Sequence, residues 1–250
     1  MTPRDELKTL LAQKELLIFD LDGTLFNTLG DLAPAVNFAM TQLGLKTHPN
    51  DDVRTFIGNG SMNLIRRAIA ANYIDVNIVR NFDKVAAVLE REGFSEESVK
   101  EIHKVYSEYY WKHCTENTEP YEGVVELIKR IANSAGIKRA AMLTNKPVAP
   151  AQKILEKFGL ENSFATYLCG DTTPERKPSP AGIFEILRQT GIAPEKAIMI
   201  GDDTPDVLAA KNAGIDCITL FEGFGKAENL LPLSPRYTAG HIKDFAKFID

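Results

Sequence analysis

Short apolar runs that stop at polar residues recur along this chain, and they restrict its fold more than any other feature. The first run, LLIF at residues 16–19, ends at Asp20 and is typical of a strand buried on both faces. Similar runs occupy residues 140–143, 167–169, 197–200 and 217–220, and they alternate with helical patterns at 124–131, 151–158, 181–189 and 205–212. Such alternation predicts an α/β fold in which helices flank a parallel sheet.

Residues 30–113 differ from the rest because they show only helical periodicity. Apolar residues such as Leu64 and Ile65 recur at helical spacing, and no convincing strand pattern interrupts them. We therefore expect an all-helical insertion after the first strand. The predicted architecture is a discontinuous Rossmann-like core, residues 1–29 and 114–250, with an inserted helical cap domain.

Composition and charge disfavour several classes of function. The net charge is −5 at pH 7, and lysines and arginines are mixed with acids, so we expect no nucleic-acid partner. No stretch offers the ~20 apolar residues that a membrane span needs, and we predict a cytoplasmic protein. Three cysteines without metal-type spacing disfavour a disulfide framework or a zinc site. The sequence carries no signal for the oligomeric state.

Polar segments follow four of the predicted strands, three of them directly and one, residues 177–178, in the loop after the third strand. They are residues 20–24, 144–146, 177–178 and 201–206. Ligands of open parallel sheets bind beyond the carboxyl ends of the strands. Each segment alone could be an ordinary turn, but the four in this order after strands predict one functional site.

The residue types in these segments suit phosphate chemistry. Asp20 and Asp202, at adjacent strand ends, would form the hard-oxygen pocket that Mg²⁺ prefers. Lys177 and the metal would neutralise a bound phosphate, and the Thr144 hydroxyl and the Asn145 backbone N–H could donate hydrogen bonds to its oxygens. Asp20 could then attack phosphorus in line. The alternatives are that Lys177 is a solvated loop lysine and that Thr144 only ends a strand.

A second carboxylate in the same turn predicts a proton-transfer role. Asp22 would protonate the leaving group and later take a proton from the attacking water. Gly23 permits the sharp turn that this arrangement requires. The prediction is thus hydrolysis of a small phosphate ester through a phosphoryl group carried on Asp20.

These motifs resemble those of the haloacid dehalogenase superfamily of phosphotransferases, over nearly the whole chain. Residues 20–25 are similar to its first motif, Thr144 and Asn145 to the second, Lys177 to the third and residues 201–206 to the fourth. The resemblance implies that Asp20 is the nucleophile and a metal ligand, that Asp22 is the acid/base and gives its backbone carbonyl to the metal, and that Asp202 is the third metal ligand. It also implies that Asp206 supports these groups.

Within the superfamily, residues 53–60, 144–147 and 221–225 resemble bacterial phosphoglycolate phosphatases, which implies 2-phosphoglycolate as substrate. The loop at Asn59 and Gly60 precedes a predicted helix, whose N–H groups could receive the substrate carboxylate. A hinge without ligand contact is the open alternative. The chain departs from the family in a predicted helix before the first strand, from Thr2 to about Gln13.

Other functions on the same core stay open. A pyrophosphatase and a β-phosphoglucomutase-like phosphotransferase would keep both aspartates of the first motif. Haloacid dehalogenases and phosphonoacetaldehyde hydrolases lack the second one, so Asp22 argues against both. A phosphoacceptor signalling module also loads phosphate onto an aspartate at a strand end, but it would lack the helical insertion and would not turn over.

Overall fold

The chain divides into two compact units, an α/β unit and a helical unit. The computed structural model describes residues 2–134, 136 and 138–249. The α/β unit comprises the residues up to Asn27 and those from Glu119 onward, and the helical unit comprises Thr28–Thr118. Within the helical unit, the Asp31 carboxylate accepts hydrogen bonds from the backbone N–H groups of Asn117 and Thr118, each at 2.8 Å. These bonds attach residues 117 and 118 to the helical unit. The predicted domain boundaries, 29/30 and 113/114, stay predictions.

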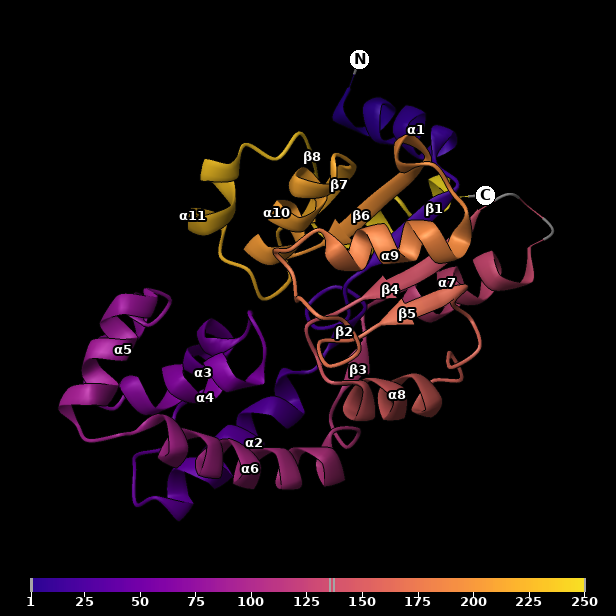
Figure 1. The fold of residues 1–250 in the computed structure, drawn as a ribbon. Helices are drawn as coiled ribbons and strands as arrows, with labels where there is room; N and C mark the ends of the chain where they lie inside the picture. Colours follow the sequence, from indigo (N-terminus) through magenta and orange to yellow (C-terminus); the bar gives the residue numbers. More distant parts are fainter. Residues whose placement is uncertain (1, 135, 137, 250) are drawn as a thin grey trace. The chain divides into compact units, whose positions relative to one another are not determined.

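The α/β unit is built on a six-stranded sheet in the order β5-β4-β1-β6-β7-β8, and every neighbouring pair is parallel. The strands are β1 (Leu16–Phe19), β4 (Arg139–Leu143), β5 (Thr166–Leu168), β6 (Ala197–Gly201), β7 (Asp216–Leu220) and β8 (Tyr237–Ala239). A separate antiparallel ribbon joins β2 (Phe26–Asn27) and β3 (Glu119–Pro120). The predicted Rossmann-like α/β fold is confirmed (Figure 1).

Along the chain, helices connect the strands of the sheet, as the alternation in the sequence predicts. The α-helices of this unit are α1 (Pro3–Gln13), α7 (Val124–Asn133), α8 (Val148–Lys157), α9 (Ala181–Thr190), α10 (Thr204–Ala213) and α11 (Ala227–Leu230). Short 3₁₀ turns are η2 (Pro194–Lys196), η3 (Leu231–Leu233), η4 (Ile242–Asp244) and η5 (Ala246–Phe248). The predicted helix before the first strand is present as α1, and it begins with a capping box at Thr2.

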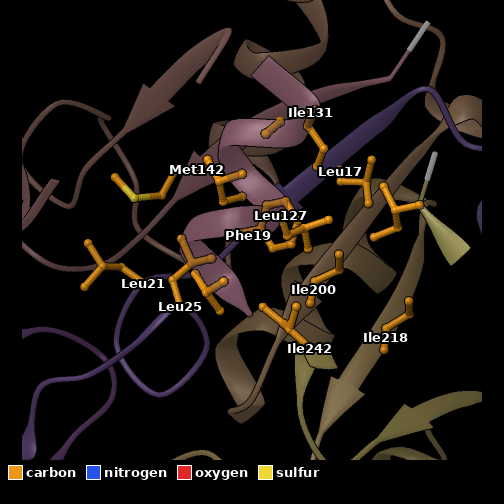
Figure 2. Packing of buried hydrophobic residues seen from close by; sticks show 14 of the residues in the cluster. Leu17, Phe19, Leu21, Leu25, Leu127, Ile131, Met142, Ile200, Ile218 and Ile242 are labelled. Atoms are coloured by element: carbon orange, nitrogen blue, oxygen red, sulfur yellow. The ribbon is translucent and has the colours of Figure 1, made fainter. Parts of the chain in front are cut away.

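Strand β1 is buried on both faces, which places it at the centre of the α/β unit. Its side chains alternate: Leu17 and Phe19 pack into one hydrophobic cluster, and Leu16 and Ile18 pack into another on the opposite face. Figure 2 shows the first cluster, in which side chains of α7 such as Leu127 pack against this strand. The rigid sheet thereby fixes the position of the residue that follows β1, Asp20.

The helical unit has a hydrophobic core of its own. Its helices are α2 (Leu29–Gln42), α3 (Asn50–Phe56), α4 (Ser61–Ala70), η1 (Val76–Ile78), α5 (Phe82–Arg91) and α6 (Glu96–His113). Leu64 and Ile65, the residues that indicated helical periodicity, are both in this core. The aromatic side chains of Tyr106 and Tyr110 on α6 are also buried there, as expected for aromatics at helical spacing.

A buried histidine predicts a pH-dependent stability of the helical unit. The His48 Nε2 atom lies 2.8 Å from the Ala68 carbonyl oxygen, and burial lowers the pKa of this imidazole from 6.5, against smaller opposing effects of the Ala68 carbonyl and of Asp52. Because the unfolded chain binds a proton more readily, lowering the pH through 6.5 favours unfolding.

We expect the wild-type Tm to fall by about 1–3 °C more between pH 7.5 and pH 5.5 than the Tm of His48→Gln. Glutamine keeps an N–H that can donate to the Ala68 carbonyl but does not titrate. Thermal unfolding followed by circular dichroism measures the difference. Equal falls in the two proteins would contradict this assignment.

Candidate active site

The carboxyl ends of three adjacent strands bring the predicted site residues together. Strand β1 lies between β4 and β6 in the sheet (Figure 1), and Asp20, Thr144 and Asp202 directly follow these three strands. The Asp20 N–H donates to the Ile200 carbonyl at 3.0 Å, and the Thr144 N–H donates to the Leu168 carbonyl at 3.0 Å. The backbone at both positions is therefore held by the sheet itself.

Three carboxylates form an acidic cluster at this edge of the sheet. One oxygen from each of Asp20, Asp202 and Asp206 lies within 4.8 Å of the others. Burial, opposed by Lys177 and reinforced by Asp206, raises the pKa of Asp20 to about 7. Burial and the neighbouring carboxylates raise the pKa of Asp202 well above its ordinary value. A cation between these groups would relieve both effects.

The cluster contains Asp206 where the predicted metal set contains Asp22. The two sets differ because Asp22 is expected to contribute its backbone carbonyl, whereas the three oxygens that lie together belong to side-chain carboxylates. Hard, negatively charged oxygen donors at this spacing fit a divalent cation such as Mg²⁺. Asp20, Asp202 and Asp206 could thus hold a metal ion.

Lys177 is the cation that the structure places in the acidic cluster. Its Nζ atom lies 2.9 Å from Asp20 Oδ1 and 2.6 Å from Asp206 Oδ1, and only 1% of its side chain is exposed. Burial alone would lower the pKa of this ammonium, but Asp20 and Asp206 outweigh burial and raise it. The alternative of a solvated loop lysine is wrong.

Asn145 holds the backbone of Lys177 in place. Its side-chain Nδ2 donates to the Lys177 carbonyl at 2.9 Å, and its Oδ1 accepts from the Lys177 N–H at 3.0 Å. This pair of bonds joins the segment after β4 to the loop after β5. The Thr144 hydroxyl accepts a bond from the Lys146 N–H at 3.2 Å. The predicted contacts of Thr144 and Asn145 with phosphate stay predictions.

Asp206 is bonded on all sides by protein groups. Its Oδ2 accepts from the N–H groups of Asp202 and Asp203 at 3.1 Å and 3.0 Å, and its Oδ1 accepts from Lys177 Nζ at 2.6 Å. Asp206 is in the first turn of α10, where it completes a capping box with Asp203. Its carboxylate thus fixes the loop that carries Asp202.

Two groups to which the sequence analysis gave no role hold the Asp202 carboxylate. The Thr24 hydroxyl donates to Asp202 Oδ1 at 2.6 Å, and the Phe224 N–H donates to Oδ2 at 2.7 Å. Gly223 fits here because a Cβ atom on it would lie 2.3 Å from the Asp202 Cβ. The available signal was the Gly-Phe-Gly segment after β7, which the sequence indicates only as part of a family resemblance.

A second buried lysine contacts Asp22. Lys146 Nζ donates to Asp22 Oδ1 at 2.8 Å, and the two side chains are 3% and 17% exposed. The sequence placed Lys146 in a motif but gave it no role. The turn between Asp22 and the next strand requires glycine, because Gly23 has φ of 84° and a Cβ there would lie 2.3 Å from Asp202 Oδ2.

The loop that contains Asn59 and Gly60 belongs to the helical unit. Gly60 is the N-cap residue of α4, with φ of 86° and no side-chain cap. Asn59 also has a positive φ, 60°, and its carbonyl accepts from the Asn63 side chain at 2.8 Å. The backbone of this loop is thus compatible with both the carboxylate-binding role and the hinge role.

The fold and the site together define an α/β enzyme that works at the carboxyl edge of a parallel sheet. The model of one protein family, the haloacid dehalogenase-like hydrolases, matches residues 17–220. This chain belongs to that family. No helix in the described part of the chain combines the length and apolar character that crossing a membrane requires.

Several named proteins are similar to this chain over most of its length. The phosphoglycolate phosphatase of Psychrobacter arcticus is 35% identical over 238 residues, which cover 95% of each protein. Phosphoglycolate phosphatase 1 of Pseudomonas aeruginosa is 32% identical, over 94% of this chain and 79% of that protein. A solved structure, described as a predicted phosphoglycolate phosphatase from Haemophilus somnus, has a TM-score of 0.79 at 28% identity and covers 95% of this chain and 99% of that chain. The predicted resemblance, and with it the predicted hydrolytic enzyme, is confirmed.

Proposed function

We propose that this chain is a Mg²⁺-dependent phosphatase that hydrolyses 2-phosphoglycolate through an aspartyl-phosphate on Asp20. The observation that carries the chemistry is the Asp20 carboxylate at the end of β1, with the Lys177 ammonium 2.9 Å away. The names of the relatives support the choice of substrate. A cytoplasmic location and the lack of nucleic-acid and membrane partners stay predictions.

In the first proposed step, an Asp20 oxygen forms a bond to phosphorus while the bond from phosphorus to the ester oxygen breaks. Asp22 gives a proton to that leaving oxygen. In the second step water attacks the phosphoryl group on Asp20, Asp22 takes the proton of the water, and inorganic phosphate leaves with the Asp20 carboxylate restored. Asp22 thus returns to its starting protonation state in each cycle.

The remaining groups orient and neutralise the phosphate. Lys177 offsets its negative charge beside Asp20, and the Thr144 hydroxyl and the Asn145 N–H donate to its oxygens. Mg²⁺, held by the carboxylates of Asp20 and Asp202 and the carbonyl of Asp22, would supply further charge neutralisation. Asp206 keeps both Lys177 and the Asp202 loop in place.

A substrate panel with and without metal tests this function. We expect release of inorganic phosphate from 2-phosphoglycolate in Mg²⁺, at least about tenfold more efficiently than from pyrophosphate or glucose phosphates. Activity should disappear in excess EDTA and return when Mg²⁺ is added in excess, because Lys177 would otherwise have to offset the phosphate charge beside Asp20 without the metal. Full activity in the chelator would contradict the metal requirement. A preference for pyrophosphate would instead support the alternative substrate.

The loop at Asn59 is the proposed binding site for the substrate carboxylate, and a charge change there tests it. We expect Asn59→Asp to raise the KM for 2-phosphoglycolate at least about fivefold, since like charges repel, and to leave the KM for p-nitrophenyl phosphate nearly unchanged. Aspartate tolerates the positive φ of this position.

Asn59→Gly is the matched control, because glycine keeps the backbone conformation without adding charge. A substitution at Gly60 would be less informative, since its φ of 86° makes any larger residue strained. Equal effects of Asn59→Asp on both substrates would return this loop to the hinge interpretation.

A further inference from the structure

A basic cavity of about 490 Å³ lies on the α/β unit, between α1 and the C-terminal segment. Its described lining residues are Arg4, Lys8, Ala12, Lys138, Lys247 and Phe248. Four of these six side chains are cationic and none is acidic, whereas the whole chain carries a net charge of −5. The lining of the cavity is therefore positively charged, although the protein as a whole is negatively charged.

Helix α1 contributes three of the lining residues of this cavity. Arg4, Lys8 and Ala12 are spaced by four residues and so lie in one row along the helix. The other face carries Leu7 and Leu11, which are buried in the core of the α/β unit. The core thus holds α1 in an orientation that presents its cationic row to the cavity.

An aromatic ring from the C-terminal segment contacts two of the cations. The Arg4 guanidinium carbon lies 5.6 Å from the centre of the Phe248 ring, and Lys247 Nζ lies 5.7 Å from the same centre. Attraction to the face of a ring offsets part of the repulsion between two like charges. The Phe248 ring therefore helps to hold two of the four cations at the cavity.

Ion pairs with the described carboxylates do not neutralise this cluster of cations. Within the described residues, none of Arg4, Lys8, Lys138 and Lys247 is ion-paired with an acid. Hydrogen bonds from Thr2 are the main cause of the lowered pKa of the Asp5 carboxyl. Lys8 and Arg4 also lower this pKa, but their contributions are the smallest. The Asp5 carboxylate is engaged in the cap of α1, where it accepts from the Thr2 N–H and hydroxyl.

We propose that this cavity binds a small polyanion that carries a diphosphate group. Guanidinium and ammonium groups are the side chains that pair best with phosphoryl oxygens, and the volume is within the range of small-ligand sites. Lys138 directly precedes β4, so the cavity is at the amino ends of the strands, whereas Asp20 follows the carboxyl end of β1. The polyanion site is thus separate from the catalytic carboxylates.

Calorimetric titration of pyrophosphate into the full chain, freed of Mg²⁺ on a chelating resin, tests the proposal. We expect saturable binding that is at least about tenfold weaker in the double variant Lys8→Glu/Lys247→Glu and that weakens as salt is raised. The control Lys104→Glu/Lys112→Glu, on exposed residues of α6, changes the net charge equally and should bind as the wild type does. The neutral pair Lys8→Gln/Lys247→Gln covers the case in which charge reversal disturbs folding.

A parallel titration with ADP distinguishes two sources of the diphosphate group. Equal affinity for ADP and pyrophosphate would support recognition of the diphosphate alone, and tighter binding of ADP would support a nucleotide whose base adds contacts. Absence of saturable binding, or equal weakening in both charge-reversed pairs, would overturn the proposal. Hydrolysis of 2-phosphoglycolate by Lys8→Glu/Lys247→Glu should stay at the wild-type rate, so this test is independent of the proposed catalytic function.

Discussion

Asp20→Asn is expected to lower kcat for 2-phosphoglycolate by at least about 10³-fold. An amide is not a nucleophile toward phosphorus, and the substitution also removes one of the two carboxylates proposed to hold Mg²⁺. Labelled phosphate should be found on the wild-type protein after acid quenching and be absent from the variant. Asp83→Asn, at an exposed position in the first turn of α5, is the matched control and should keep the wild-type rate.

The stability of Asp20→Asn separates a chemical defect from a folding defect. Burial raises the pKa of Asp20 to about 7, so the ionised carboxylate is unfavourable in its metal-free surroundings. A neutral amide of the same shape relieves that cost, and Lys177 keeps its contact with Asp206 at 2.6 Å. The Tm in Mg²⁺-free buffer should therefore equal or exceed that of the wild type. Turnover near the wild-type rate would exclude Asp20 as the nucleophile.

The core strands could be predicted because their burial is two-sided. All four residues of β1 are buried, and a run without polar residues leaves few alternatives to a central strand. Strand β8 escapes prediction because Tyr237–Ala239 is three residues long and only partly buried, so its identity comes from pairing with β7. The helical pattern indicates a start at 151, whereas α8 begins at Val148. Pro150 obscures those first residues, although proline is tolerated in a first helical turn.

The candidate site could be predicted only in part, because some of its residues directly follow strands and others lie on loops. Strand ends are coupled to the sheet, so the positions of Asp20 and Asp202 directly after two strand patterns suffice to predict that they meet. The contacts of Thr24 and Phe224 with Asp202 depend on the path of two loops, which local pattern does not determine. The same holds for the ion pair between Lys146 and Asp22.

The cationic lining of the basic cavity could not be predicted from the sequence either. Along the sequence, lysines and arginines are mixed with acids, and no long basic cluster is visible. Folding brings residues 4 and 8 beside residues 138, 247 and 248, which are separated by more of the chain than any motif spans. A linear pattern of charge therefore excludes a long basic tract, but it does not exclude a compact cationic site.

Lys177→Met is expected to lower kcat at least about 10²-fold and also to destabilise the fold. The substitution leaves Asp20 and Asp206 facing each other without the ammonium that lies 2.9 Å and 2.6 Å from them. Breaking a buried ion pair by removing one partner costs about 3–5 kcal/mol. In a chain of this size that cost lowers Tm by roughly 2–4 °C per kcal/mol.

Lys177→Arg should restore most of the stability but only part of the rate. Its charge compensates both aspartates, whereas its planar, wider guanidinium does not fit the space that a compact ammonium occupies between a carboxylate and a phosphate. Phosphate release and thermal unfolding are measured together for both variants, with Lys211→Met on the exposed side of α10 as control. Because Lys177→Arg is expected to remain folded, its rate tests the catalytic role of the Lys177 ammonium even if Lys177→Met does not fold. A wild-type rate in Lys177→Arg would show that only the charge matters, and a wild-type rate in Lys177→Met would remove this lysine from the mechanism.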